Sequence, residues 1–165
     1  MKKIKGGVTA AKGFEAASAA AGIKYQGRTD MALVYSQKPC EAAGTFTTNV
    51  VKAAPVKWDK KVVESNAKPQ VIVINSGIAN ACTGDAGMEC CKEVAKEVTK
   101  VLETETESVL IGSTGVIGMQ LPVEKMKDGV HLLAKEKAEG LEMGNLAAKA
   151  IMTTDTKEKE AAVTI

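Results

Sequence analysis

The sequence predicts an α+β domain in which a layered sheet packs against helices. Short apolar and β-branched runs, typical of strands, are interspersed with longer segments whose apolar residues recur at helical spacing. The two kinds of segment do not alternate strictly, which favours a layered α+β arrangement over a doubly wound parallel sheet. A length of 165 residues suits a single domain, residues 1–165, with a substantial core.

The composition excludes several classes of protein. Hydrophobic residues make up 45% and charged residues 25% of the chain, which is ordinary for a globular protein. The net charge of +2 argues against nucleic acid or a membrane surface as a partner, and 3% aromatic residues leave few platforms for stacking bases. No signal peptide or membrane span is visible, so we expect a cytoplasmic protein.

The cysteines and the histidine do not form a metal-binding pattern. There are four cysteines and one histidine, and no CxxC pair occurs. This pattern lacks the ligand spacing of zinc sites, so we expect reduced thiols and no bound metal. The cysteines are Cys40, Cys82, Cys90 and Cys91.

The N-terminal half predicts strands around one helix. Residues 5–30 are rich in glycine and alanine and predict loop and short strand pieces. Met31–Ser36 and Ala43–Thr48 have strand-forming residues and are expected to pair. Pro55 opens a predicted helix that ends at Glu64. Pro69–Asn75 is a continuous apolar run, typical of a strand buried on both faces.

The C-terminal half is predicted to be mainly helical. Its longest helix shows apolar residues at spacings of three and four, with Lys and Glu between them. In chain order the predicted segments are a glycine-rich loop over 75–87, a helix over 85–103, a strand over 109–111, a helix over 122–136, a short helix over 145–152 and a strand-like end over 161–165.

The central stretch, residues 109–122, is the strongest candidate for chemistry. Two hydroxyl residues, Ser113 and Thr114, stand between Gly112 and Gly115 in a predicted tight turn. Flanking glycines allow positive φ and let another group come close. A backbone N–H beside a hydroxyl is what a site needs to hold developing negative charge on an oxygen. The alternative is that these are ordinary turn residues.

Three polar loops follow apolar elements, at residues 75–77, 112–115 and 153–156. If the strands before the first two are neighbours, these loops emerge at one edge of the sheet and line one cleft. No Walker loop, GxSxG elbow or complete set of nucleophile, base and orienting group is present. His131 lies beside the apolar stripe of its predicted helix and is interpreted as a packing or surface residue.

Five segments occur in a characteristic order: GGVTAAKGF, GRTDMALVYS, VINSGIANACTGDAG, IGSTGVIGMQLP and AIMTTDT. Together they resemble the N-terminal part of ornithine acetyltransferase, the bifunctional glutamate N-acetyltransferase of arginine biosynthesis. The resemblance covers nearly the whole chain, and several motifs in register are far more specific than any one of them.

The resemblance implies a layered α/β/β/α-type fold and a precursor that cleaves itself between an Ala and a Thr. The chain then corresponds to an incomplete α chain, and the β chain carries the nucleophile as its new N-terminal threonine. The implied reaction transfers acetyl from N2-acetylornithine to glutamate through an acetyl-threonine and releases ornithine. No cofactor is implied, although some members also accept acetyl-CoA as a substrate. The αβ units are expected to pair as α2β2.

The resemblance places the oxyanion hole on Thr114 and Gly115 and a substrate contact on Thr153, with Thr154 as the alternative. The family's substrate-binding lysine, in an AKG motif, and the scissile Ala-Thr pair do not occur in the sequence. We therefore expect the chain alone to be inactive. Two other interpretations remain: a non-catalytic fragment with a role in assembly, and part of a related self-processing aminopeptidase with an N-terminal nucleophile.

Overall fold

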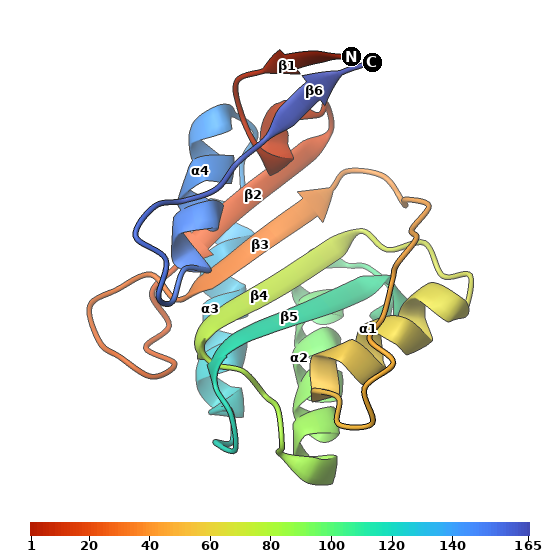
Figure 1. Ribbon diagram of the computed structural model, residues 1–165, viewed down its shortest axis with the longest axis vertical. Helices are drawn as coiled ribbons and strands as arrows, with labels where there is room; N and C mark the ends of the chain where they lie inside the picture. The colour runs from red at the N-terminus through yellow and green to blue at the C-terminus, as the bar shows by residue number, and fades with distance from the viewer.

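A four-stranded sheet forms the centre of the computed structural model, which describes all residues 1–165 (Figure 1). The spatial order of the strands is β2-β3-β4-β5. The pairs β2–β3 and β3–β4 are antiparallel, whereas β4 and β5 are parallel. The strands are β2 (Phe14–Ala19), β3 (Met31–Ser36), β4 (Val71–Ile78) and β5 (Val109–Val116).

Helices cover the sheet unequally on its two faces. In the view of Figure 1, α2 (Gly84–Leu102) and α3 (Val123–Glu136) pack behind the sheet, and α4 (Leu141–Ala150) lies in front over β2 and β3. Helix α1 (Ala54–Glu64) lies beside β5, at the edge of the sheet, and also contacts α2. Short 3-10 turns occur at Val8–Ala10 and Thr106–Ser108. Strands β1 (Lys2–Ile4) and β6 (Ala162–Thr164) pair antiparallel and bring the two termini together.

The main core lies between the sheet and the rear helices. Strand side chains such as Leu33 and Val73 meet Val98, Val130 and Leu133 from the helices, and all five are fully buried. Burying each such side chain stabilises the fold by about 1.5–3 kcal/mol. The predicted apolar stripes of the two long helices are therefore confirmed.

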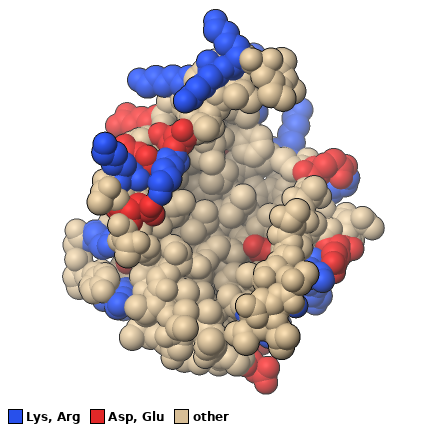
Figure 2. Space-filling model, in the orientation of Figure 1, with Lys and Arg blue, Asp and Glu red and all other residues tan.

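The front face carries a smaller core and an uncovered region. Under α4 the contact is built from four alanines, Ala16, Ala32, Ala147 and Ala150. Beyond α4 the apolar face of β4 is not covered, and Ile72 is 37% exposed. Figure 2 shows this side of the molecule as a hollow of uncharged residues, with charged side chains gathered at its rim.

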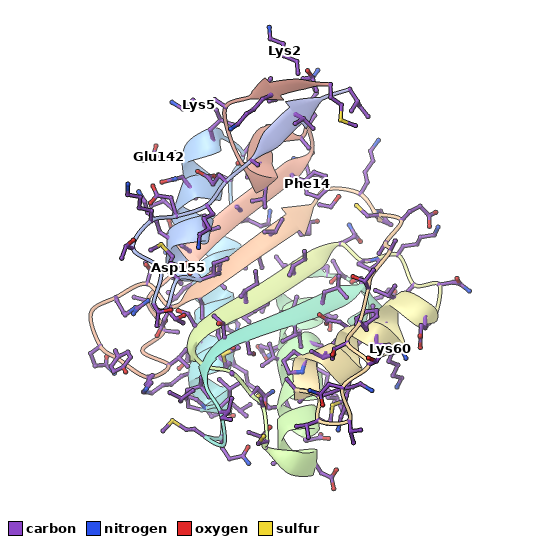
Figure 3. All side chains as sticks on the ribbon, viewed as in Figure 1. Lys2, Lys5, Phe14, Lys60, Glu142 and Asp155 are labelled. Atoms are coloured by element: carbon purple, nitrogen blue, oxygen red, sulfur yellow. The ribbon has the colours of Figure 1, made fainter.

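Helix α1 closes part of the outer edge of the sheet at β5. Trp58 Nε1 donates to the carbonyl of Val109 at 2.9 Å, and Asp59 Oδ1 accepts from the N–H of Ile111 at 2.8 Å. These side chains replace hydrogen bonds that a fifth strand would make, which protects an otherwise open edge. Burial raises the pKa of Asp59 to about 6, although the hydrogen bond from Ile111 opposes the rise. Lys60 points away from the sheet (Figure 3).

The prediction of a strand over Ala43–Thr48 is wrong. This segment has no regular structure and is mostly exposed. Strand β3 is present at the predicted residues, but β2 pairs with one of its edges and β4 with the other. No edge of β3 remains for a further strand. The partner comes instead from the alanine-rich Phe14–Ala19, where only short strand pieces were expected.

The prediction of loops over 75–77 and 112–115 is wrong, because both segments lie within strands β4 and β5, close to their carboxyl ends. In the parallel register Asn75 lies opposite Ser113, and Gly77 opposite Gly115. The pairing of the two strands overrides the weak strand propensity of their glycines. The two strands are neighbours, so the condition for their ends to lie at one edge of the sheet is met.

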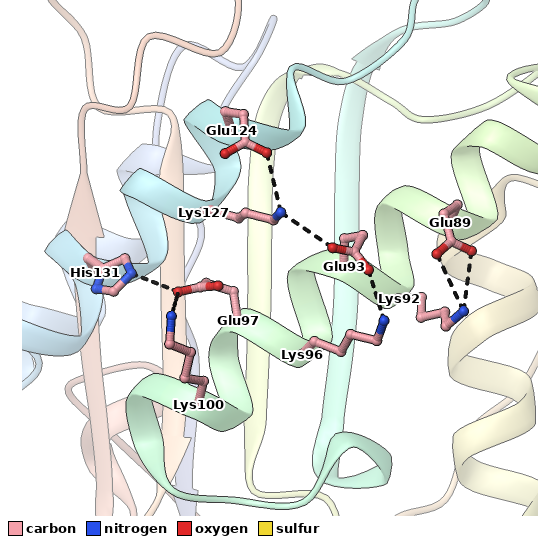
Figure 4. A network of polar contacts seen from close by, with 9 residues as sticks. All are labelled: Glu89, Lys92, Glu93, Lys96, Glu97, Lys100, Glu124, Lys127 and His131. Atoms are coloured by element: carbon pink, nitrogen blue, oxygen red, sulfur yellow. Dashed lines mark hydrogen bonds and ion pairs between the residues drawn. The ribbon is translucent and has the colours of Figure 1, made fainter.

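Ion pairs connect the exposed faces of α2 and α3 (Figure 4). Lys127 Nζ bridges Glu93 at 3.3 Å and Glu124 at 3.2 Å. His131 Nε2 lies 2.8 Å from Glu97 Oε1, and this hydrogen bond is the main reason that the pKa of Glu97 is lowered. The interpretation of His131 as a surface residue is confirmed, because its side chain is 55% exposed. Neither helix, nor any other in the structure, has the length and apolarity needed to cross a membrane.

Candidate functional site

A cleft of about 360 Å³ lies at the carboxyl ends of β4 and β5. It gathers residues from four separate parts of the chain: the β2–β3 loop, β4, β5 and the segment after α4. All four residues that the family resemblance assigns to the site, including the alternative Thr154, line it. The lining residues are Lys24, Tyr25, Arg28, Gly77, Thr114, Gly115, Val116, Thr153 and Thr154.

Glycines let the two strands approach each other closely at the cleft. Gly115 has a φ of +137°, and a Cβ at this position would collide with the backbone of Gly77 and lie 2.6 Å from the N of Ile78. Gly77 has a φ of +105°, and its Cβ would lie 3.0 Å from the Cβ of Lys24. A side chain at Gly115 would therefore displace the backbone of β4, and one at Gly77 would press on the side chain of Lys24.

Hydroxyl groups at the strand ends have different partners. Ser113 Oγ donates to Asn75 Oδ1 at 2.7 Å, and Asn75 Nδ2 donates to the carbonyl of Ile78 at 2.9 Å. Ser76 Oγ donates to the carbonyl of Ala150 at 2.7 Å. The hydroxyl of Thr114, which lies opposite Ser76 in the register, makes no hydrogen bond within the chain. Thr114 is therefore the one of these hydroxyls that can donate to a bound molecule.

Two contacts hold the segment after α4 against the cleft. The bond from Ser76 fixes the carbonyl of Ala150, the last residue of α4, to β4. Arg28 Nη2 donates to the carbonyl of Met152 at 2.6 Å. Thr153 and Thr154 follow directly, and both are exposed. Asp155 lies beside the end of α4 (Figure 3) and pairs with Lys159.

Three cleft residues in the β2–β3 loop, Lys24, Tyr25 and Arg28, were not identified by reasoning from the sequence. Arg28 lies within the GRTDMALVYS segment, but no spacing rule connects it with Thr114. One residue could have indicated that this loop is ordered: Asp30, an acidic residue that directly precedes strand β3. Its side chain is buried and accepts backbone N–H groups of the loop, from Ala21 at 2.8 Å and Ile23 at 2.6 Å.

The cleft offers hydrogen-bond donors and cations, but no His, Cys, Asp or Glu lines it. Cys90 and Cys91 face the core, and burial raises their pKa to about 11 and about 12, so both thiols stay protonated at neutral pH. No cluster of three or more His, Cys, Asp or Glu residues is arranged to hold a metal ion. This donor set suits the stabilisation of a negatively charged oxygen, and no His, Asp or Glu lines the cleft to activate one of its hydroxyls as a nucleophile.

Comparison with known proteins gives consistent matches. Residues 15–165 match the model of the ArgJ family. The chain is 47% identical over 160 residues to the arginine biosynthesis bifunctional protein ArgJ of Gloeobacter violaceus. The matched region covers 97% of this chain and 39% of the relative. The chain thus spans about two fifths of the length of the curated relatives it matches, at 39% and 38% for two of them.

Two solved structures share the fold. The arginine biosynthesis bifunctional protein ArgJ of Bacillus halodurans superposes with a TM-score of 0.90 at 34% identity, covering 96% of this chain and 82% of the other. The ornithine acetyltransferase of Mycobacterium tuberculosis, solved in complex with ornithine, superposes with a TM-score of 0.89 at 44% identity. That match covers 94% of this chain and 83% of the other, so the α+β layered fold class is confirmed.

Proposed function

This chain belongs to the ArgJ family, and we propose that it is part of a glutamate N-acetyltransferase that moves acetyl from N2-acetylornithine to glutamate. One observation carries the proposal: the cleft at the ends of β4 and β5 contains Thr114, whose hydroxyl has no partner, beside Gly115. The names of the matched proteins, which refer to arginine biosynthesis and to ornithine acetyltransferase, support this choice of reaction.

In this proposal Thr114 and Gly115 form the oxyanion hole of an acyl transfer. Backbone groups alternate in direction along a strand. The carbonyl of Val109 and the N–H of Ile111 face α1 at the outer edge of β5, so the N–H of Gly115 is expected at the same edge beyond α1. The Thr114 hydroxyl and this N–H would both donate to the tetrahedral intermediate, and each such donor typically lowers the barrier by about 3 kcal/mol.

The nucleophile is proposed to be the N-terminal threonine of a β chain, released when the same precursor cleaves itself. Its hydroxyl attacks the acetyl carbonyl of N2-acetylornithine, and its own amine acts as the base. Ornithine leaves, and the amine of glutamate then attacks the acetyl-threonine ester and restores the hydroxyl. Thr153, or its neighbour Thr154, would contact the polar groups of the amino-acid substrate from the edge of the cleft.

The proposed assembly is an α2β2 heterotetramer in which residues 1–165 belong to the α part. We propose the cytoplasm as its compartment, although a relative from Oryza sativa is named as chloroplastic. Acetyl-CoA is retained as an alternative acetyl donor, and no cofactor is proposed. A self-processing aminopeptidase would use the same oxyanion hole, but the names of the matched relatives favour acetyl transfer over peptide hydrolysis.

The function is tested by assaying residues 1–165 joined to the C-terminal part that the relatives possess. With N2-acetylornithine and glutamate, we expect equal amounts of N-acetylglutamate and ornithine to form. Residues 1–165 alone are expected to form neither, because the proposed nucleophile belongs to the β chain. Hydrolysis of short peptides without acetyl transfer would contradict the proposed reaction, and turnover by the isolated chain would contradict the proposed location of the nucleophile.

A further inference from the structure

Two cations stand at the mouth of the cleft without acidic partners. Lys24 and Arg28 both come from the β2–β3 loop, and neither takes part in an ion pair. Lys24 Nζ lies 4.8 Å from the centre of the Tyr25 ring, which also lines the cleft. Because no Asp or Glu lines the cleft, the charge of this pair is not compensated there.

The loop that carries the pair is held in place from several sides. Both carboxylate oxygens of Asp30 accept backbone N–H groups of the loop, and the Asp30 side chain is 2% exposed. Lys125 Nζ, from α3, donates to the carbonyl of Gly22 at 2.7 Å. Lys24 packs directly over Gly77 at the end of β4. The two ends of the loop are therefore held by buried anchors, and Lys24 is positioned by its contact with Gly77.

Arg28 also connects this loop to the threonine segment. One of its guanidinium nitrogens donates to the carbonyl of Met152 at 2.6 Å. A guanidinium has five N–H donors, so donors remain for a bound carboxylate. Arg28 can thus hold an anion within reach of Thr153 while keeping its structural bond.

The reactants of the proposed transfer differ in net charge. At neutral pH glutamate is a net anion, because its two carboxylates outweigh its one protonated amine. N-acetylglutamate is a stronger anion, because acetylation removes the charge of that amine. N2-acetylornithine is net neutral, and ornithine is a net cation because both of its amines are protonated. An uncompensated pair of cations attracts glutamate and N-acetylglutamate and repels ornithine. Its net effect on the neutral N2-acetylornithine is small.

We propose that Lys24 and Arg28 form an acceptor-selecting cation pair that binds a carboxylate of glutamate and disfavours ornithine at the mouth of the cleft. After the acetyl group has been transferred to the enzyme, the pair promotes departure of ornithine and entry of glutamate. Glutamate is thereby favoured over ornithine as the acceptor of the acetyl group. This inference rests on the proposed function and adds two specificity-determining residues to it.

The test uses the whole protein, residues 1–165 with the C-terminal part of its relatives. We compare Lys24→Gln, Arg28→Gln and the double variant with Lys12→Gln, which removes the same charge from an exposed lysine outside the cleft. The KM for glutamate is expected to rise about tenfold or more in the double variant, as for the loss of charge-assisted hydrogen bonds. The KM for N2-acetylornithine should stay near the wild-type value, and ornithine should become a stronger competitor of glutamate. Arg28→Lys should retain most of the preference.

Three results separate this inference from the proposed function. If the wild type transfers acetyl and the double variant behaves like Lys12→Gln, the cation pair has no role in selection and the proposed function stands. Equal increases in the KM of both substrates would also overturn selection by charge. A wild-type protein that transfers no acetyl would overturn the proposed function and the inference together. For a variant without turnover, calorimetric binding of glutamate to the whole protein provides the comparison.

Discussion

At the scale of single residues, neighbouring hydroxyl groups at the cleft have different roles: some form hydrogen bonds within the protein and one does not. Ser113 and Ser76 use their hydroxyls to bind the structure together, through Asn75 and Ala150, whereas the Thr114 hydroxyl stays free. The local pattern of two hydroxyl residues between glycines treated Ser113 and Thr114 alike, and only the family resemblance singled out Thr114 and Gly115. The distinction arises because strand alternation directs Ser113 and Thr114 to opposite faces of β5.

Gly115→Ala is predicted to destabilise the fold as well as the site. An alanine at a φ of +137° is strained, which costs about 1–3 kcal/mol. The new Cβ would in addition collide with the backbone of Gly77. Gly118→Ala is the matched control, because Gly118 also has a positive φ but no atom lies within 4 Å of its Cβ position.

Urea denaturation of the variants measures the difference. We expect a lower free energy of unfolding for Gly115→Ala than for Gly118→Ala, and a still lower one for Gly115→Val, whose branched side chain needs more space. Equal stabilities of the two alanine variants would show that the close approach of β4 and β5 at Gly115 is not required.

At the scale of elements, α1 acts as a side-chain substitute for a missing strand. Trp58 and Asp59 satisfy backbone groups at the first half of β5, and the second half continues into the cleft. The helix itself was predicted from Pro55, which suits its first turn. Its contact with β5 could not be predicted, because Trp58 and Val109 are 51 residues apart and no local pattern links them.

Asp59 is predicted to make the stability of the protein depend on pH. Burial raises its pKa from 3.8 to about 6, so the folded state binds this proton more tightly than the unfolded state does. The contribution of Asp59 to the free energy of unfolding is therefore greatest below pH 3.8 and is lost as the pH rises through about 6. Asp59→Asn removes the charge but keeps an acceptor for Ile111, so this variant should lose that pH dependence.

Denaturation between pH 4 and pH 8 compares the wild type with Asp59→Asn and Asp59→Ala. The alanine variant leaves the N–H of Ile111 without a partner, so it should be about 1 kcal/mol less stable than the asparagine variant at every pH. The asparagine variant should match or exceed the stability of the wild type at pH 8. An unchanged dependence on pH in Asp59→Asn would show that another group titrates in this range.

At the scale of the whole molecule, local patterns predicted the elements better than their partners. Helical periodicity identified α2 and α3, and the apolar run of Met31–Ser36 identified β3. The alanine-rich Phe14–Ala19 was uncertain, since alanine favours helices and only contact with α4 and β3 makes this segment a strand. Similarly, Lys24 and Arg28 reach the cleft only through tertiary structure. The motif residues could be predicted, whereas the loop that completes their surroundings could not.

The central claim is that Thr114 donates a hydrogen bond to the oxyanion of an acetyl transfer. The most direct test is the kcat of the whole protein for transfer from N2-acetylornithine to glutamate, measured for Thr114→Ala and Thr114→Ser. The alanine variant should retain its fold, because the Thr114 hydroxyl has no partner within the chain, and its kcat should fall about 100-fold or more. The serine variant keeps the hydroxyl and should stay close to the wild type. A wild-type kcat in Thr114→Ala would contradict the account.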